Sequence, residues 1–121
     1  MAVPLCQKKA EFFRTLGHPV RIRVLELLGD GPLAVHDLLE NIEIEASNLS
    51  QQLAVLRRAG IVTSTRRGGT VLYALAGPDV VELMRAARSF LTQILHGQAD
   101  LLGELRDEPA AAGRQPATSA V

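Results

Sequence analysis

The chain has 121 residues, which is enough for one domain with a single hydrophobic core. Hydrophobic residues make up 47% of it and charged residues 21%, as in ordinary soluble globular proteins. No apolar run approaches the roughly 18 residues of a membrane span, and the N-terminus lacks the apolar core of a signal peptide. The single cysteine, Cys6, excludes an internal disulfide and agrees with a reducing compartment. We therefore expect a cytoplasmic protein with no membrane partner.

The formal net charge is zero, which by itself argues against a nucleic-acid partner. The charges are nevertheless unevenly distributed along the chain. Between Ala46 and Pro78 there is no aspartate or glutamate, and this window contains Arg57, Arg58, Arg66 and Arg67. A neutral chain can therefore still present one positive face.

The first helix is predicted from Lys8 to Leu16, where the apolar spacing is expected to bury Phe12, Phe13 and Leu16. Cys6 precedes this segment. Its thiol could act as a sensor or join two subunits, but a lone cysteine is more often buried in the protein core.

Two further helices follow a Gly-His-Pro break. Pro19 suits the first position of the second helix, so His18 is interpreted as a helix-start residue rather than a metal ligand. The second helix is predicted to end at segment 29–32, which is rich in glycine and proline. A third helix, at about residues 34–41, offers its apolar residues to the core: Val35, Leu38 and Leu39.

A fourth helix, residues 47–59, follows a tight connection and buries Leu49, Leu53 and Leu56 at spacing i, i+4, i+7. Its first turns carry small neutral hydrogen-bonding side chains, Ser47, Asn48, Ser50 and Gln51, and no carboxylate. Such groups can hydrogen-bond to base edges, whereas a solvated helix usually favours glutamate and lysine. The alternative is an ordinary amphipathic helix whose polar face is simply hydrated.

After Gly60 the pattern changes to that of strands. The segments IVTST and TVLYAL flank Arg66-Arg67-Gly68-Gly69, which predicts a hairpin with glycines at the positive-φ positions. A long final helix follows from about residue 80 to 105, and its apolar stripe is wider than a small domain needs. We expect one domain at residues 1–106 and a disordered tail at 107–121.

The predicted order is α-α-α-α-β-β-α, mainly α with a small β-hairpin, which describes a winged helix-turn-helix. The segments LGHPVRIRVLELL, LAVHDLLENIEIEASNLSQQLAVLRRAGIV and RRGGTVLYAL resemble the ArsR/SmtB family of bacterial transcriptional repressors. The resemblance covers about residues 11–95. It implies a homodimer formed by the first and last helices. This dimer is expected to bind a palindromic double-stranded DNA operator, with an affinity that an effector lowers.

The resemblance also implies which residues contact DNA. The helix at 47–59 becomes the recognition helix, and the hairpin becomes the wing that grips the adjacent backbone or minor groove. The implied contacts are Ser47, Asn48, Ser50, Gln51, Arg58, Arg66, Arg67 and Gly68.

Two standard metal sites of this family lack their ligands here. The third-helix pattern Cys-Val-Cys-Asp-Leu is replaced by Ala-Val-His-Asp-Leu at residues 34–38. The last-helix pattern, Asp-x-His followed by His-x-x-Glu, keeps only its first residue, since its four positions hold Asp79, Val81, Thr92 and Leu95. We therefore expect no standard metal site and no cofactor.

A non-standard metal site remains an alternative. His96, Asp100 and Glu104 stand at i, i+4 and i+8 on one helical face, and a dimer would double them. The competing interpretation is a solvated polar stripe near the end of the helix. His36 is expected to be exposed beside the DNA-facing helix.

An enzyme and a protein-binding module are the two competing classes of function. An enzyme is not expected, because His36 and Asp37 are adjacent on one short helix, where side chains point about 100° apart. Asp37 is therefore not expected to orient His36 for a catalytic triad with Ser47 or Ser50. A winged-helix module that contacts proteins, or a regulator that needs a partner protein, agrees with the zero net charge.

Overall fold

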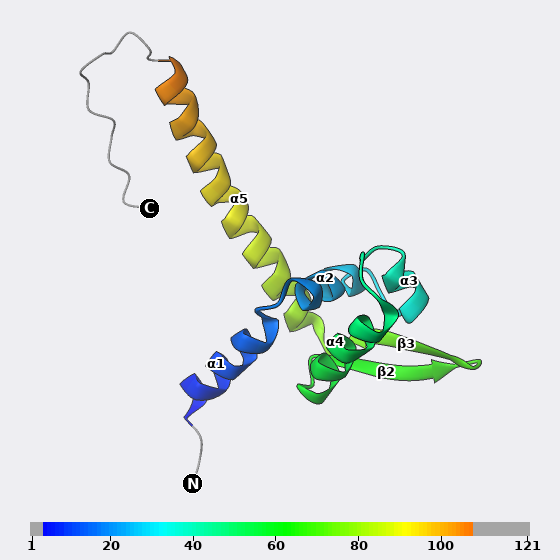
Figure 1. The fold of residues 1–121 in the computed structure, drawn as a ribbon. Coiled ribbons are helices and arrows are strands. Elements are labelled where there is room, and N and C mark those ends of the chain that lie inside the picture. Colours follow the sequence, from blue (N-terminus) through cyan, green and yellow to red (C-terminus); the bar gives the residue numbers. More distant parts are fainter. Residues whose placement is uncertain (1–3, 108–121) are drawn as a thin grey trace. The chain divides into compact units, whose positions relative to one another are not determined.

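The computed structural model of the chain describes residues 4–107. The chain divides into two compact units with a boundary between Met84 and Arg85. The elements are, in order, α1 (Leu5–Leu16), α2 (Pro19–Leu28), β1 (Leu33–Ala34), α3 (Val35–Leu39), α4 (Ala46–Arg58), β2 (Val62–Arg67), β3 (Thr70–Leu75) and α5 (Pro78–Asp107) (Figure 1). None of the helices in this part of the chain combines the length and apolarity that crossing a membrane requires.

The predicted helices and hairpin are all present, which confirms a mainly helical winged helix-turn-helix. The sheet, however, has three antiparallel strands rather than two, in the order β1-β3-β2. In β1, Leu33 lies opposite Tyr73 and Ala34 lies opposite Leu72. A strand of two residues has no alternation of apolar and polar side chains, so the sequence pattern does not predict it.

The helix boundaries differ from the prediction by one to three residues, most clearly at α1 and α3. α1 begins at Leu5 rather than Lys8, and its extra turn is exposed, so no buried apolar spacing marks it. α3 ends at Leu39 rather than Asn41. There the side-chain amide of Asn41 donates to the Asp37 carbonyl at 2.9 Å and helps to close the chain into a turn.

The hairpin between β2 and β3 turns at Gly68-Gly69, where Arg67 pairs with Thr70 across the turn. Gly68 has φ 53° and Gly69 has φ 85°. Two-residue hairpin turns of this kind need positive φ at both positions, which glycine adopts without a steric penalty. The predicted glycine hairpin is confirmed, and it carries two arginines to its tip.

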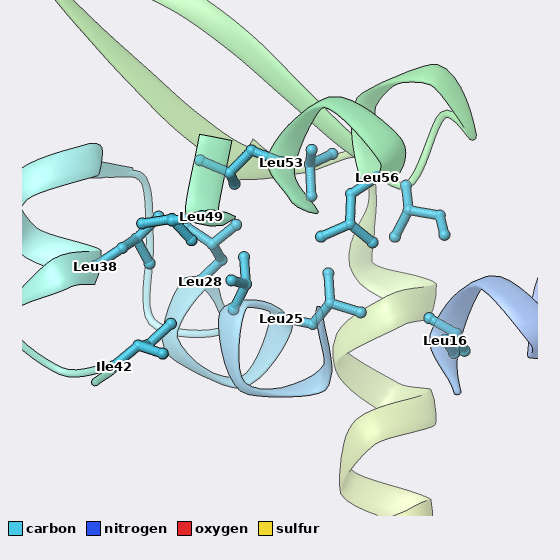
Figure 2. Packing of buried hydrophobic residues seen from close by; sticks show 11 residues of the cluster. Leu16, Leu25, Leu28, Leu38, Ile42, Leu49, Leu53 and Leu56 are labelled. Atoms are coloured by element: carbon cyan, nitrogen blue, oxygen red, sulfur yellow. The ribbon is translucent and has the colours of Figure 1, made fainter. Parts of the chain in front are cut away.

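A leucine-rich core joins α2, α3 and α4 in the first unit (Figure 2). The predicted anchors of α4, Leu49, Leu53 and Leu56, have no exposed surface. Figure 2 shows them on the side of α4 that faces Leu25 and Leu28 of α2. The helix is therefore held by one face, and its opposite face is left free.

α1 contacts this core mainly through its C-terminal end. Leu16 is its only buried residue, and Phe12 is partly buried against the core. The expected burial of Phe13 is wrong, since that side chain is 56% exposed. Neighbouring side chains on a helix diverge by about 100°, so one phenylalanine faces the core and the other faces away. Cys6 is also exposed, contrary to the commoner buried case, because its turn of α1 does not reach the core.

The second unit consists of α5 from Arg85 onward, within the described residues. No side chain of α5 is fully buried, and large apolar side chains are exposed along this part: Phe90, Leu91, Leu95, Leu102 and Leu105. Phe90, for example, is 63% exposed. The predicted apolar stripe is therefore in contact with water in a single chain. Of the tail expected at 107–121, residues 108–121 lie outside the described residues.

His18 caps the N-terminus of α2, as expected for a helix-start residue. Its Nδ1 accepts a hydrogen bond from the backbone N–H of Val20 at 3.2 Å. His18→Ala removes this acceptor and should lower the free energy of unfolding by about 1 kcal/mol. His18→Asn supplies a side-chain oxygen and should keep most of that stability. Urea unfolding followed by circular dichroism measures both, and equal losses in the two variants would argue against the capping role.

Candidate nucleic-acid interface

The outer face of α4 brings together four of the predicted contact residues. Ser47, Asn48, Ser50 and Gln51 are all exposed in its first two turns. The helix has no acidic residue in its first turn. The first N–H groups of a helix lack intrahelical partners, and the side chain of the N-cap residue, Glu45, makes no capping hydrogen bond. This end of α4 therefore offers amide and hydroxyl donors with the positive end of the helix dipole, which suits phosphate.

Arg58 lies at the other end of the same stripe. It follows Ser47 by three helical turns, so the two residues share one face about 16 Å apart along the axis. Arg58 and its neighbour Arg57 are both exposed in the last turn of α4. The polar face thus begins with neutral hydrogen-bonding groups and ends with positive charge.

The tip of the β2–β3 hairpin holds the other three predicted contacts. Arg66, Arg67 and Gly68 are exposed. Successive side chains of a strand point to opposite faces, so the two arginines leave the hairpin on different sides. A Cβ built on Gly68 would meet no atom within 4 Å, so the backbone at the tip is open to close approach.

The arginines of α4 and the hairpin have no carboxylate partner within residues 4–107. The ion pairs in that range are Arg23 with Glu26, at 3.5 Å, and His36 with Asp37, at 3.2 Å. Because α4 and β2 contact each other in the first unit, these positive charges and the polar face of α4 belong to one continuous part of the structure.

A series of side-chain hydrogen bonds, which the sequence does not predict, connects α2 to the polar residues of α4. Arg21 Nε donates to Gln52 Oε1 at 2.8 Å, and Gln52 Nε2 donates to Asn48 Oδ1 at 3.0 Å. Arg21 Nη1 also donates to the carbonyl of Thr15 at 3.1 Å. The i, i+4 spacing of Asn48 and Gln52 is a local signal for their contact. The contact with Arg21 spans 31 positions, and no sequence pattern marks it.

His36 and Asp37 contact each other, so the expectation that their side chains diverge is wrong. His36 Nε2 lies 3.2 Å from Asp37 Oδ1, although the residues are adjacent. Both side chains are partly or largely exposed, so they are free to turn toward each other, and His36 is exposed as expected. Among the hydrogen bonds of residues 4–107, none joins His36 to Ser47 or Ser50, so the contact does not extend to a hydroxyl.

The residues considered for metal binding do not gather into a site. Within residues 4–107 no group of three or more His, Cys, Asp or Glu side chains could hold a metal ion. His96, Asp100 and Glu104 are all exposed on α5. In one chain they form a polar stripe.

A recognition-type helix preceded by a turn and followed by a hairpin defines the winged helix-turn-helix class. The family model described as bacterial regulatory protein, arsR family, matches residues 18–64. The HTH-type transcriptional regulator Rv0081 of Mycobacterium tuberculosis is 49% identical over 104 residues, which cover 85% of this chain and 91% of that protein. The chain belongs to the ArsR family and is a helix-turn-helix transcriptional regulator.

Solved structures agree with this assignment. The crystal structure of Rv0081 has a TM-score of 0.74 at 48% identity, covering 81% of this chain and 99% of that one. The transcriptional repressor BigR of Xylella fastidiosa has a TM-score of 0.66 at 34% identity, covering 70% and 87%. The homodimeric winged helix-turn-helix DNA-binding domain of Mb0332 from Mycobacterium bovis has a TM-score of 0.70 at 26% identity, covering 77% and 86%.

Proposed function

We propose that this regulator is a cytoplasmic repressor that binds a palindromic DNA operator as a homodimer. The observation that carries the proposal is the division of α4 into two faces. Three leucines without exposed surface fix one face, and the other presents Ser47, Asn48, Ser50 and Gln51 with no carboxylate in the helix. A helix with this outer face can enter the negatively charged major groove and hydrogen-bond to base edges.

The residues of the interface have different roles in this proposal. Asn48 and Gln51 face base edges, while Ser47 and Ser50 contact bases or the backbone near the positive end of α4. Arg58 neutralises a phosphate at the far end of the helix. Arg66 and Arg67 contact the backbone beside the groove, and Gly68 lets the tip of the wing approach closely, since no side chain intervenes there.

Exposed apolar surface supports the homodimer. Leu5 and Phe13 are exposed on α1, and five large apolar side chains are exposed on α5. A second copy of the chain would cover such a surface, and the related domain of Mb0332 is homodimeric. Twofold symmetry then places two recognition helices about one DNA turn apart, roughly 34 Å, which calls for a palindromic site.

The effector is proposed to differ from the metals of the two standard family sites. The third-helix positions hold Ala34 and His36 where both cysteines would be, and the last helix keeps only Asp79 of its four ligands. No cofactor forms part of this proposal.

Replacement of Gln51 and Ser47 tests the recognition helix. Gln51→Ala should relax specificity at one base pair of each half-site and cost about 1–3 kcal/mol of operator affinity, because a bidentate contact to a base is lost. Ser47→Ala should weaken binding to all sequences alike. Fluorescence anisotropy on an operator selected from random DNA measures both effects. Unchanged binding by both variants would remove α4 from the interface.

Charge removal at the hairpin tip tests the wing. Replacing Arg66 and Arg67 together by alanine should reduce the slope of log affinity against log salt by up to about 2 per subunit, since two phosphate neutralisations are lost. The matched control replaces both by lysine, which keeps the charge and should keep the slope. A slope that stays the same in the alanine variant would mean that the hairpin points away from DNA.

A charge within the apolar stripe of α5 tests the homodimer. Leu91→Glu should dissociate the dimer and abolish tight operator binding, because the carboxylate would be buried at the seam. Gln93→Glu places the same charge about 200° around the helix and should leave the dimer intact. Analytical ultracentrifugation distinguishes them. A wild-type protein that sediments as a monomer at micromolar concentration would instead favour a partner protein as the cover of this stripe.

A further inference from the structure

We propose that Arg21 and Gln52 set the base preference of the repressor by fixing the orientation of the Asn48 amide. In this arrangement Asn48 presents its NH₂ group to DNA and selects a base edge with hydrogen-bond acceptors. The proposal rests on the proposed function, because it assumes that α4 enters the major groove. Arg21 and Gln52 are positioning residues, which act on DNA only through Asn48.

Arg21 determines which atom donates and which accepts in each of these hydrogen bonds. A guanidinium has five N–H donors and no acceptor. The Gln52 atom that lies 2.8 Å from Arg21 Nε must therefore be the carbonyl oxygen, Oε1. This contact removes the usual ambiguity between the oxygen and nitrogen of a glutamine side chain.

The same logic passes from Gln52 to Asn48. With Oε1 turned to Arg21, the NH₂ group of Gln52 is the one that faces Asn48, and it can only donate. The Asn48 atom at 3.0 Å from Gln52 Nε2 is therefore its oxygen, Oδ1. The other end of the Asn48 amide carries two N–H donors, and Asn48 is exposed on the outer face of α4.

The side chain of Arg21, from which these hydrogen bonds begin, is held in place by two contacts. Arg21 Nη1 donates to the backbone carbonyl of Thr15 at 3.1 Å, and both hydrogen bonds of Arg21 are partly buried. Gln52 is itself half-buried, next to the fully buried Leu53. Hydrogen bonds that involve a charged donor are stronger than neutral ones, so the Gln52 amide has one strongly favoured orientation.

The consequence for recognition is a preference among bases. An unrestrained asparagine uses both its oxygen and its NH₂ group to pair with adenine. Here one lone pair of Asn48 Oδ1 is already used, whereas both N–H groups are free to donate. The best matches in the major groove are bases that present acceptors without an adjacent donor, namely guanine with O6 and N7 and thymine with O4, whereas N7 of adenine lies beside an amino donor.

Gln52→Glu tests the proposal with almost no change in side-chain shape. The carboxylate still accepts from Arg21, but its second oxygen can only accept, so Asn48 must turn and donate its NH₂ group inward. Asn48 Oδ1 would then face DNA and favour bases with an amino donor, adenine or cytosine. At one position of each half-site, the relative affinity should shift by about threefold to tenfold toward those bases. Selection of bound DNA from a random pool by the full-length chain measures this shift.

Two comparisons separate this effect from a general loss of binding or folding. In the Asn48→Ala background, the additional Gln52→Glu change should no longer alter the preferred base at that position, since the group that turns is absent. Arg21→Lys keeps a donor-only partner and should keep the wild-type preference. Arg21→Gln supplies both donor and acceptor and should relax it. Thermal unfolding of each variant accounts for changes in stability.

Three results would overturn the proposal. Gln52→Glu could weaken binding to all sequences equally, which would mean that Asn48 contacts phosphate. The same shift in base preference could also persist in the Asn48→Ala background, which would place its origin elsewhere. In both cases the wild-type chain still selects an operator, so the proposed function stands. A wild-type chain that selects no DNA sequence would overturn the repressor function together with the positioning role.

Discussion

The packing of three leucines of α4 against the core is the contact on which the rest of the interface depends. Leu49, Leu53 and Leu56 have no exposed surface, and burial of one leucine side chain contributes about 1.5–3 kcal/mol. Turning α4 by one residue would expose all three, at a cost comparable to the whole free energy of unfolding of a small domain. The direction in which its polar side chains point is therefore fixed by apolar burial and not by those side chains.

The same core also sets the direction of the wing. Gly60, with φ 77°, follows the C-cap residue of α4, and the next two residues, Ile61 and Val62, are buried at 3% and 1% exposure. The root of β2 is thus part of the core, while the tip at Gly68 is open. The hairpin extends from a fixed base, so its position relative to α4 does not need a separate set of contacts at the tip.

Most of the fold was predictable because local sequence patterns indicate its elements. The spacing of buried leucines predicts the face of α4, and the two glycines predict the turn of the hairpin. The sequence could not show which of Phe12 and Phe13 faces the core, because that depends on how α1 docks. It also could not show the His36–Asp37 contact, which arises from the freedom of exposed side chains, or β1, which is too short to have a pattern.

The candidate site also contains residues that the sequence predicts and residues whose positions depend on tertiary packing. The exposed residues of α4 and the hairpin tip follow from residue type and periodicity, and their placement on the surface agrees with expectation, while their contacts to DNA stay predictions. The positions of Arg21 and Gln52 behind Asn48 depend on how α2 packs beside α4. A contact between residues 31 positions apart needs the tertiary structure, because neither residue is unusual in its own segment.

The length of α5 has a consequence for how the protein folds. From Arg85 onward the helix has no fully buried side chain in a single chain, whereas most helical stability in proteins comes from packing of an apolar face. Much of its helical order therefore has to come from whatever covers the apolar stripe. If a second copy does so, folding of this segment is coupled to association, and the thermal midpoint rises with protein concentration. At low cellular abundance, the regulator would then lose helical structure in α5 as well as occupancy of its operator.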